Sequence, residues 1–286
     1  MLGMSNYKRG IKSSKEFVAV TPQGIPMKAL EVFETSHKRV EHLLKLHELL
    51  HNRRRRRMRA DWARRFKTLM HWRQSEAIDR VDGHRAIVIL REGAQLTAAQ
   101  FHEEYLNDLL RAALASSVGA LDRYCHELIL SHIVPALKRP SVEWPKTLQR
   151  LRLPMPAVKA AVLHASKPKS RPMNVVRDAV RELLHRDFTL QRPDEIERAL
   201  SMIGMSKLWI KTLKRKPSLA SNTKELKRHL NLIVTRRNRI VHEGDIKRKK
   251  RGGKVEFHSI GREEIAGEVQ WVSELIRVID AVTRGK

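Results

Sequence analysis

The residues best placed for chemistry lie near the end of a helix predicted over residues 222–242. Arg237 stands at a position where the helical pattern calls for an apolar residue. Burying a guanidinium is unfavourable unless an anion or hydrogen-bond acceptors meet it, so Arg237 is either a paired structural arginine or a preformed anion site. The apolar stripe that Arg237 interrupts consists of Leu226, Leu230, Ile233, Ile240 and Val241.

Asn238 and His242 accompany Arg237 on this helix. Asn238 and His242 are four residues apart and share a face, whereas Arg237 and His242 are five apart and differ by roughly 140° around an ideal helix. Arg237 and His242 meet at one phosphate if Arg237 reaches round the helix, if the last turn unwinds, or if a two-fold axis brings a second copy alongside. A symmetric dimer would then pool two arginines and two histidines.

Gly244 is a natural residue to end this helix, because glycine readily adopts the left-handed conformation of a helix terminus. His242 would then lie in the last turn, where the carbonyl ends favour the protonated imidazolium. That setting suits a proton-transfer residue working near neutral pH. The alternative is a histidine that only caps the helix.

The string RRNRIVHEGD, which contains these residues, is similar to the signature of the HEPN superfamily. That signature has an arginine, a polar residue directly after it, and a histidine a few positions downstream. The nearest resemblance is to RiboL-PSP-type HEPN proteins, because an apolar helix over residues 107–127 contains LDRYCHE. It covers about residues 101–283 and leaves the basic N-terminal hundred unexplained.

The resemblance implies a metal-independent endoribonuclease without a cofactor, acting as a homodimer, often in phage defence or a toxin system. It implies that the RNA 2′-hydroxyl attacks the adjacent phosphate, which leaves a cyclic phosphate and a 5′-hydroxyl end. His242 would move protons, Arg237 would stabilise charge on the phosphoryl oxygens, and Asn238 would orient the phosphate or His242. DNA lacks the 2′-hydroxyl and would not be cut.

Two other functions remain open on the sequence. Some HEPN domains keep the bundle without nuclease activity, so the chain could be a non-catalytic RNA-binding or defence-complex subunit. A scaffold that binds an acidic, antitoxin-like inhibitory protein through its basic surface is the third reading.

Further candidates lie on the helix over residues 103–137, the predicted central core helix. Asp122 and His126 are four apart, so they either support the active site or simply pair with each other. Cys125 lies on the apolar face, which favours a small buried residue over a nucleophile. Glu243 and Asp245, beside the end of the other helix, could orient Arg237 or His242 of a partner chain, but acidic residues at a helix end are expected to be solvated.

The charge of the chain points to a polyanionic partner. Lysine and arginine number 58 against 31 acidic residues, a formal net charge of +27. RNA is the expected partner, although each basic run taken alone could be a solvated surface. Aromatic residues make up only 5% of the chain, so base-stacking platforms are expected to be scarce. The candidate nucleic-acid-binding residues are Arg53, Arg54, Arg55, Arg56, Arg57, Lys247, Arg248, Lys249, Lys250 and Arg251.

The hydrophobic periodicity predicts an all-α fold, an antiparallel helical bundle with a basic helical N-terminal extension. Residues 1–25 are predicted to be a flexible basic arm, 26–100 the extension with a basic helical hairpin, and 101–286 the HEPN-like domain. The segment 85–90 is too short and β-branched to tell a strand from a helical turn. Helices are expected at 27–50, 103–137, 175–185, 193–203, 222–242 and 262–282.

Composition excludes several classes of protein. A single cysteine rules out an intramolecular disulfide and a cysteine-based zinc site, and agrees with a reducing, cytoplasmic location. No apolar run approaches the length of a membrane span, and the N-terminus lacks the apolar core of a signal peptide. The 14 histidines lack carboxylates arranged as a ligand motif, which argues against a metal site.

Overall fold

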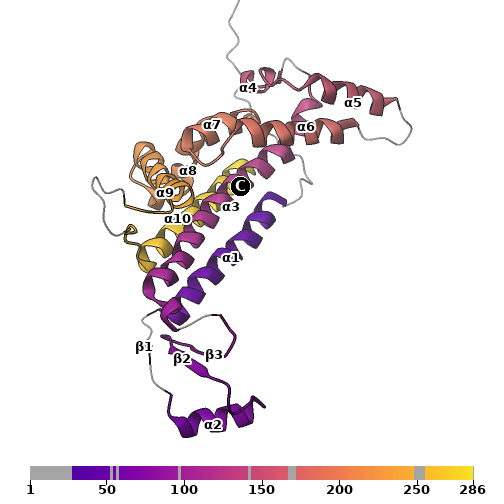
Figure 1. Ribbon diagram of the computed structural model, residues 1–286. Coiled ribbons are helices and arrows are strands. Elements are labelled where there is room, and N and C mark those ends of the chain that lie inside the picture. The colour runs from indigo at the N-terminus through magenta and orange to yellow at the C-terminus, as the bar shows by residue number, and fades with distance from the viewer. Residues whose placement is uncertain are drawn as a thin grey trace, which may run out of the picture.

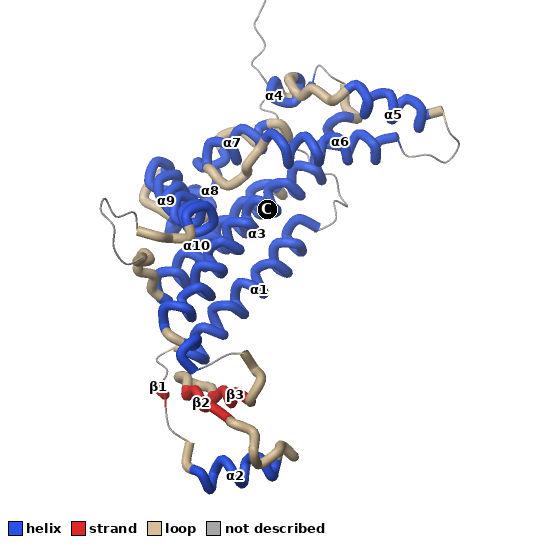
Figure 2. Tube along the Cα trace, viewed as in Figure 1, coloured by secondary structure: helices blue, strands red, loops and turns tan. Residues whose placement is uncertain are grey.

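A computed structural model describes residues 28–51, 54–55, 58–95, 98–140, 143–166, 172–247 and 255–285 (Figure 1). Long helices run along one another as an antiparallel bundle, with α3 in the middle and a small sheet beyond one end (Figure 2). The prediction of an all-α bundle is confirmed. The bundle consists of α1 (Lys28–Leu50), α3 (Glu103–Leu137), α9 (Thr223–Glu243) and α10 (Arg262–Thr283).

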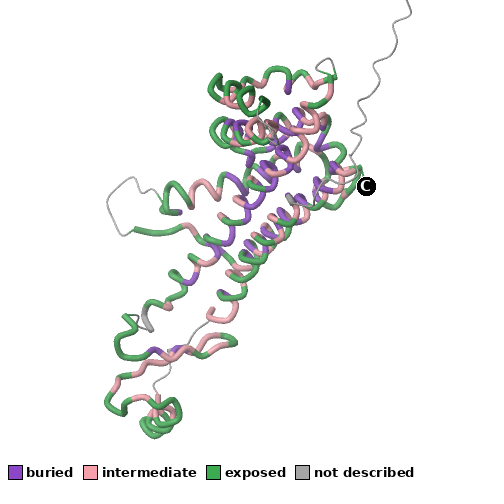
Figure 3. Tube along the Cα trace, turned by 90° about the vertical axis from the view of Figure 1, so that its right-hand side faces the viewer, coloured by how far each residue is buried: buried purple, intermediate pink, exposed green. Residues whose placement is uncertain are grey.

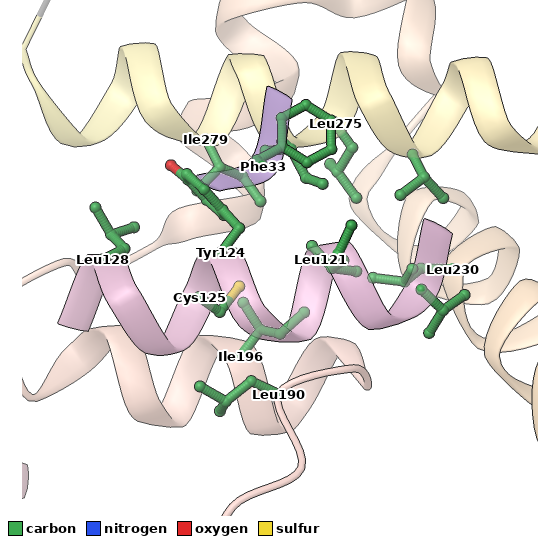
Figure 4. Close-up of a cluster of buried hydrophobic side chains, with 14 of the residues drawn as sticks. Phe33, Leu121, Tyr124, Cys125, Leu128, Leu190, Ile196, Leu230, Leu275 and Ile279 are labelled. Carbon is green, nitrogen blue, oxygen red and sulfur yellow. The ribbon is translucent and has the colours of Figure 1, made fainter. Parts of the chain in front are cut away.

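Helix α3 is apolar nearly all round, and it is covered on several sides accordingly. Helices α1, α6, α7, α9 and α10 all pack against it. Figure 4 shows Tyr124 of α3 directed toward α10 and Cys125 directed toward Ile196 of α7. Burial raises the pKa of the Cys125 thiol, so this cysteine is a core residue, as predicted. Pro135 lies inside the last turn of this helix.

Shorter helices cover the end of the bundle at which α3 finishes. The proline-rich segment after α3 forms short pieces, because proline cannot continue a helix. Helix α8 was not predicted from the sequence. The covering elements are α4 (Lys146–Gln149), α5 (Met155–Ala165), α6 (Pro172–Asp187), α7 (Pro193–Ser201), α8 (Leu208–Arg215) and the short 3₁₀ turn η3 (Pro217–Leu219).

A small antiparallel sheet lies at the other end, where α1 finishes and α3 begins. The segment left undecided is strand β3, and the predicted basic helical hairpin is wrong because a strand separates its two helices. The β2–β3 turn rests on the end of α1, where a Cβ at Gly83 would collide with the Leu49 carbonyl. In chain order the elements are β1 (Arg54–Arg55), α2 (Ala60–Leu69), β2 (Ile78–Asp82), β3 (Ile87–Arg91) and the 3₁₀ turn η1 (Ala98–Phe101).

The bundle and the sheet differ sharply in burial (Figure 3). Buried side chains run continuously through the helices, including Phe33 of α1. In the sheet, Val81 and Leu90 are the fully buried apolar residues, with Val88 and Phe101 packed around them. Helix α1 therefore belongs to the bundle core, although the sequence grouped it with the extension.

Candidate active site

Helix α9 has well-defined ends that fix the position of the candidate residues. The Asn222 side chain accepts a hydrogen bond from the Glu225 backbone N–H at 2.9 Å and caps the N-terminus. At the other end Gly244 has φ = 61°, the left-handed conformation expected of it. Leu226 and Leu230 are buried against the bundle. Arg237, Asn238 and His242 follow on the same helix, within the last two turns.

Arg237 is half-buried and poorly satisfied. Its Nη1 donates to the Asn238 side-chain oxygen at 3.0 Å, while its Nε is buried and has no hydrogen-bond partner. No carboxylate pairs with Arg237 within the part of the chain that the structure describes. A desolvated guanidinium with donors to spare is the arrangement expected of an anion site rather than of a paired structural arginine.

His242 is exposed in the last turn of α9. Among the described residues, no hydrogen bond joins His242 to Arg237, and α9 stays helical to Glu243. The last turn therefore does not unwind to bring them together. Val241 and Ile246, beside His242, are exposed apolar residues. Two of the three ways of bringing Arg237 and His242 to one phosphate therefore remain. Either Arg237 reaches round the helix, or a second copy of α9 lies alongside.

A buried ionic network centred on Asp245 lies at the end of α9, and it was not predicted from the sequence. Asp245 is completely buried and also has a left-handed backbone, with φ = 56°. Its carboxylate accepts from Arg111 Nε of α3 at 3.0 Å and from Arg239 Nε of α9 at 3.3 Å. The expectation that Asp245 is solvated is wrong.

Arg111 is the other centre of the network. Besides Asp245, it donates to the Asp108 carboxylate at 3.0 Å and to the His258 carbonyl at 3.1 Å, and it lies over the Phe257 ring. These bonds fasten the segment after α9 to the start of α3, so they hold the end of α9 in place. The signal in the sequence was an arginine between Leu110 and Ala113, two core positions of α3.

Asp122 and His126 lie far from His242 within one chain. Residue 126 is fifteen positions along α3 from Arg111, about 22 Å of helix. The buried His126 ring lies 2.8 Å from the Asp122 carbonyl and stacks on His185 at 4.4 Å. Burial, with the neighbouring His126, lowers the pKa of His185. His126 thus joins α3 to α6, and a supporting role of Asp122 and His126 in the active site stays a prediction.

The basic clusters are only partly described. Arg54 and Arg55 form β1, and Lys247 is exposed after α9. Arg53, Arg56 and Arg57 lie outside the described residues, as do Arg248 to Arg251 and the predicted arm over residues 1–25. Within the ranges that the structure covers, no group of three metal-ligating side chains is found, and no helix has the length and apolarity to cross a membrane.

Comparison with known protein families identifies a related family. A model of the family described as RiboL-PSP-HEPN matches residues 84–283. No curated protein and no solved structure matches the chain. The matched region begins in the β2–β3 turn and runs to the end of α10, so it includes Arg237, Asn238 and His242 and excludes α1 and α2.

Proposed function

Because the chain belongs to the RiboL-PSP-HEPN family, we propose that it is a metal-independent endoribonuclease with its active site on the open face of α9. The observation that carries the proposal is the Arg237 guanidinium, half-buried, bonded to Asn238 and without a carboxylate partner among the described residues. An anion is the missing partner of such a group, and a phosphodiester is an anion with oxygens that fit the guanidinium fork.

The reaction follows from the chemistry of the three side chains. A base, His242 in this proposal, takes the proton of the RNA 2′-hydroxyl, and the oxygen attacks the adjacent phosphorus. The bond from phosphorus to the 5′-oxygen breaks, and that oxygen leaves with a proton supplied by the protonated His242 or by water. Arg237 stabilises the charge on the phosphoryl oxygens. Asn238 holds the Arg237 guanidinium and orients the phosphate.

A homodimer completes the site. Arg237 and His242 point to different sides of α9, so one α9 supplies the arginine and the partner's α9 the histidine at each phosphate. The exposed Val241 and Ile246 beside His242 offer apolar surface for such a contact. In this proposal the enzyme serves phage defence or a toxin system, where an inhibitory protein would restrain it.

Cleavage of labelled RNA in the presence of a chelator tests the proposal. We expect the wild type to cut RNA and leave a cyclic phosphate, and not to cut the same strand with a 2′-deoxy substitution at the cleavage position. His242→Ala and Arg237→Ala should each abolish cleavage, whereas His42→Ala, an exposed histidine on α1, should not. RNA binding without cleavage by the wild type would instead favour the non-catalytic subunit.

Mixing the two inactive variants tests the shared site. A dimer of one Arg237→Ala chain and one His242→Ala chain keeps one site with both residues, so the mixture should regain part of the activity. If subunit exchange is verified and the mixture still shows no activity, each site takes both residues from one chain.

A further inference from the structure

The sheet β1–β3 and helix α2 form a small N-terminal module. Its side chains Trp62, Phe66 and Trp72 lie in a row, called here the aromatic ladder, and they have no role in the proposed reaction. Trp62 and Phe66 of α2 stack with ring centroids 5.0 Å apart and planes 10° apart, and Trp72 meets Phe66 edge-on at 5.5 Å. Guanidinium groups close both ends of the ladder. Arg80 lies 5.6 Å from the Trp62 ring, and Arg91 lies 4.4 Å from the Trp72 ring.

These rings do not form a core. No residue of α2 is buried, and Trp62 is 39% exposed. The fully buried apolar residues of the module are Val81 and Leu90, on the sheet. Large aromatic side chains held in order at a surface are typical of binding sites, because a ring keeps few rotatable bonds and offers a broad flat face.

The surroundings of the ladder are strongly basic. Residues 53–95 contain 13 lysines and arginines against 5 acidic residues. Arg64 and Arg65 of α2 are exposed, and no carboxylate in the described part of the chain pairs with either. In contrast, Arg80 is paired with Asp82, and Arg91 with Glu76 at 2.9 Å. Helix α2 therefore carries two exposed arginines between Trp62 and Phe66 in sequence.

We propose that the aromatic ladder and the arginines beside it bind single-stranded RNA; the choice of RNA as the polyanion rests on the proposed function. An unpaired base stacks on the Trp62 ring in place of the Arg80 guanidinium, which lies 5.6 Å from the ring centroid, and Arg64 and Arg65 contact phosphates. Stacking accepts any base, so binding is tolerant of sequence. A duplex keeps its bases covered and gains only the phosphate contacts. Aromatic residues are scarce in the chain as a whole, as the composition indicates, but three of them lie together at this surface.

Ion pairs join the module that carries the ladder to helices of the bundle. Glu48, at the end of α1, accepts hydrogen bonds or ion pairs from Arg85 of the β2–β3 turn at 3.2 Å and from Arg262 of α10 at 2.6 Å. Two residues later on α10, Glu264 pairs with Arg236, the neighbour of Arg237. These contacts fix the β2–β3 turn to the ends of α1 and α10, and Figure 1 shows α2 on the side of the sheet away from the bundle. An RNA strand bound on the ladder therefore has to extend past the sheet to reach α9.

Binding of an unstructured RNA by full-length protein tests the inference, with all variants made in the His242→Ala background so that cleavage does not interfere. Trp62→Leu keeps apolar volume but loses the ring, and we expect it to weaken binding about tenfold. Trp62→Phe keeps a ring and should lose less. Leu69→Ala, another exposed apolar change on α2, is the matched control and should leave the dissociation constant unchanged. Thermal unfolding verifies that each variant is folded.

The remaining measurements separate the alternatives. Replacing Arg64 and Arg65 by glutamine should lower the salt dependence of binding by about two phosphate contacts. A folded Trp62→Leu variant that binds unstructured RNA like its parent would overturn the ladder. Loss of binding to anionic lipid vesicles in both Leu69→Ala and Trp62→Leu, with RNA binding intact, would assign the surface to a membrane. Ladder-dependent binding without cleavage by the wild type would overturn the proposed enzyme and leave the ladder in place.

Discussion

Two arginines on opposite faces of the last two turns of α9 differ in their hydrogen-bond partners. On one face Arg239 pairs with Asp245, which is buried and shared with Arg111. On the other face Arg237 has Asn238 as its hydrogen-bond partner and keeps a buried Nε without one. The first arrangement satisfies its charges within the fold, and the second leaves donors for an outside anion. The comparison separates an arginine kept for structure from one kept for function, only two residues apart.

Breaking the buried network should have the largest effect on stability. Asp245→Ala removes the buried carboxylate that Arg111 and Arg239 share and leaves Arg111 with only the exposed Asp108 carboxylate, so we expect the free energy of unfolding to fall by about 3 kcal/mol in urea denaturation. The exposed Arg277–Glu34 pair supplies the control, since Glu34→Ala should cost less than about 1 kcal/mol. If the Asp245 variant is as stable as the control, the network does not hold the end of α9.

Replacing Arg237, on the other face of α9, should change activity much more than stability. Arg237→Met keeps the apolar stem and removes a guanidinium that is desolvated and incompletely bonded. We expect a free energy of unfolding within about 1 kcal/mol of wild type, or slightly above it, together with complete loss of RNA cleavage. A loss of more than about 2 kcal/mol would mean that Arg237 is a structural arginine after all.

Much of the fold could be predicted because helical periodicity and end signals are local. Asn222 and Gly244 delimit α9 from its own neighbours in sequence, and the prediction of that helix differs from the structure by one residue at each end. The motif residues could be found for the same reason. Asp245 could not be placed, because its burial depends on Arg111, 134 positions earlier in the chain.

The N-terminal module was predicted less well for a related reason. The sheet pairs only short strands, such as Ile78–Asp82 with Ile87–Arg91, and five residues give too little alternation to distinguish a strand from a helical turn. The aromatic ladder depends on a fold that brings Trp72 back against Phe66. An average aromatic content does not reveal rings gathered in one place.

The Glu268 carboxylate, between α9 and α10, is a third buried polar group at this surface and can be compared with the two arginines. Glu268 has one side-chain oxygen that is buried without a hydrogen-bond partner. Burial, together with the nearby Glu264, raises the pKa of Glu268 above its usual value of 4.5, although Arg236 acts in the opposite direction. The folded state therefore holds the proton more tightly than the unfolded state does.

The sign of the pH dependence follows from that difference in proton affinity. Protonated Glu268 favours folding, so its contribution is fully present below the unfolded pKa of 4.5 and is lost as the pH rises through the higher folded pKa. Glu268→Gln mimics the protonated form at every pH. We expect it to be more stable than wild type at pH 7 in urea denaturation, with the difference vanishing toward the unfolded pKa. Equal stability at both pH values would mean that Glu268 is solvated or fully paired with Arg236, as Asp245 is with its arginines.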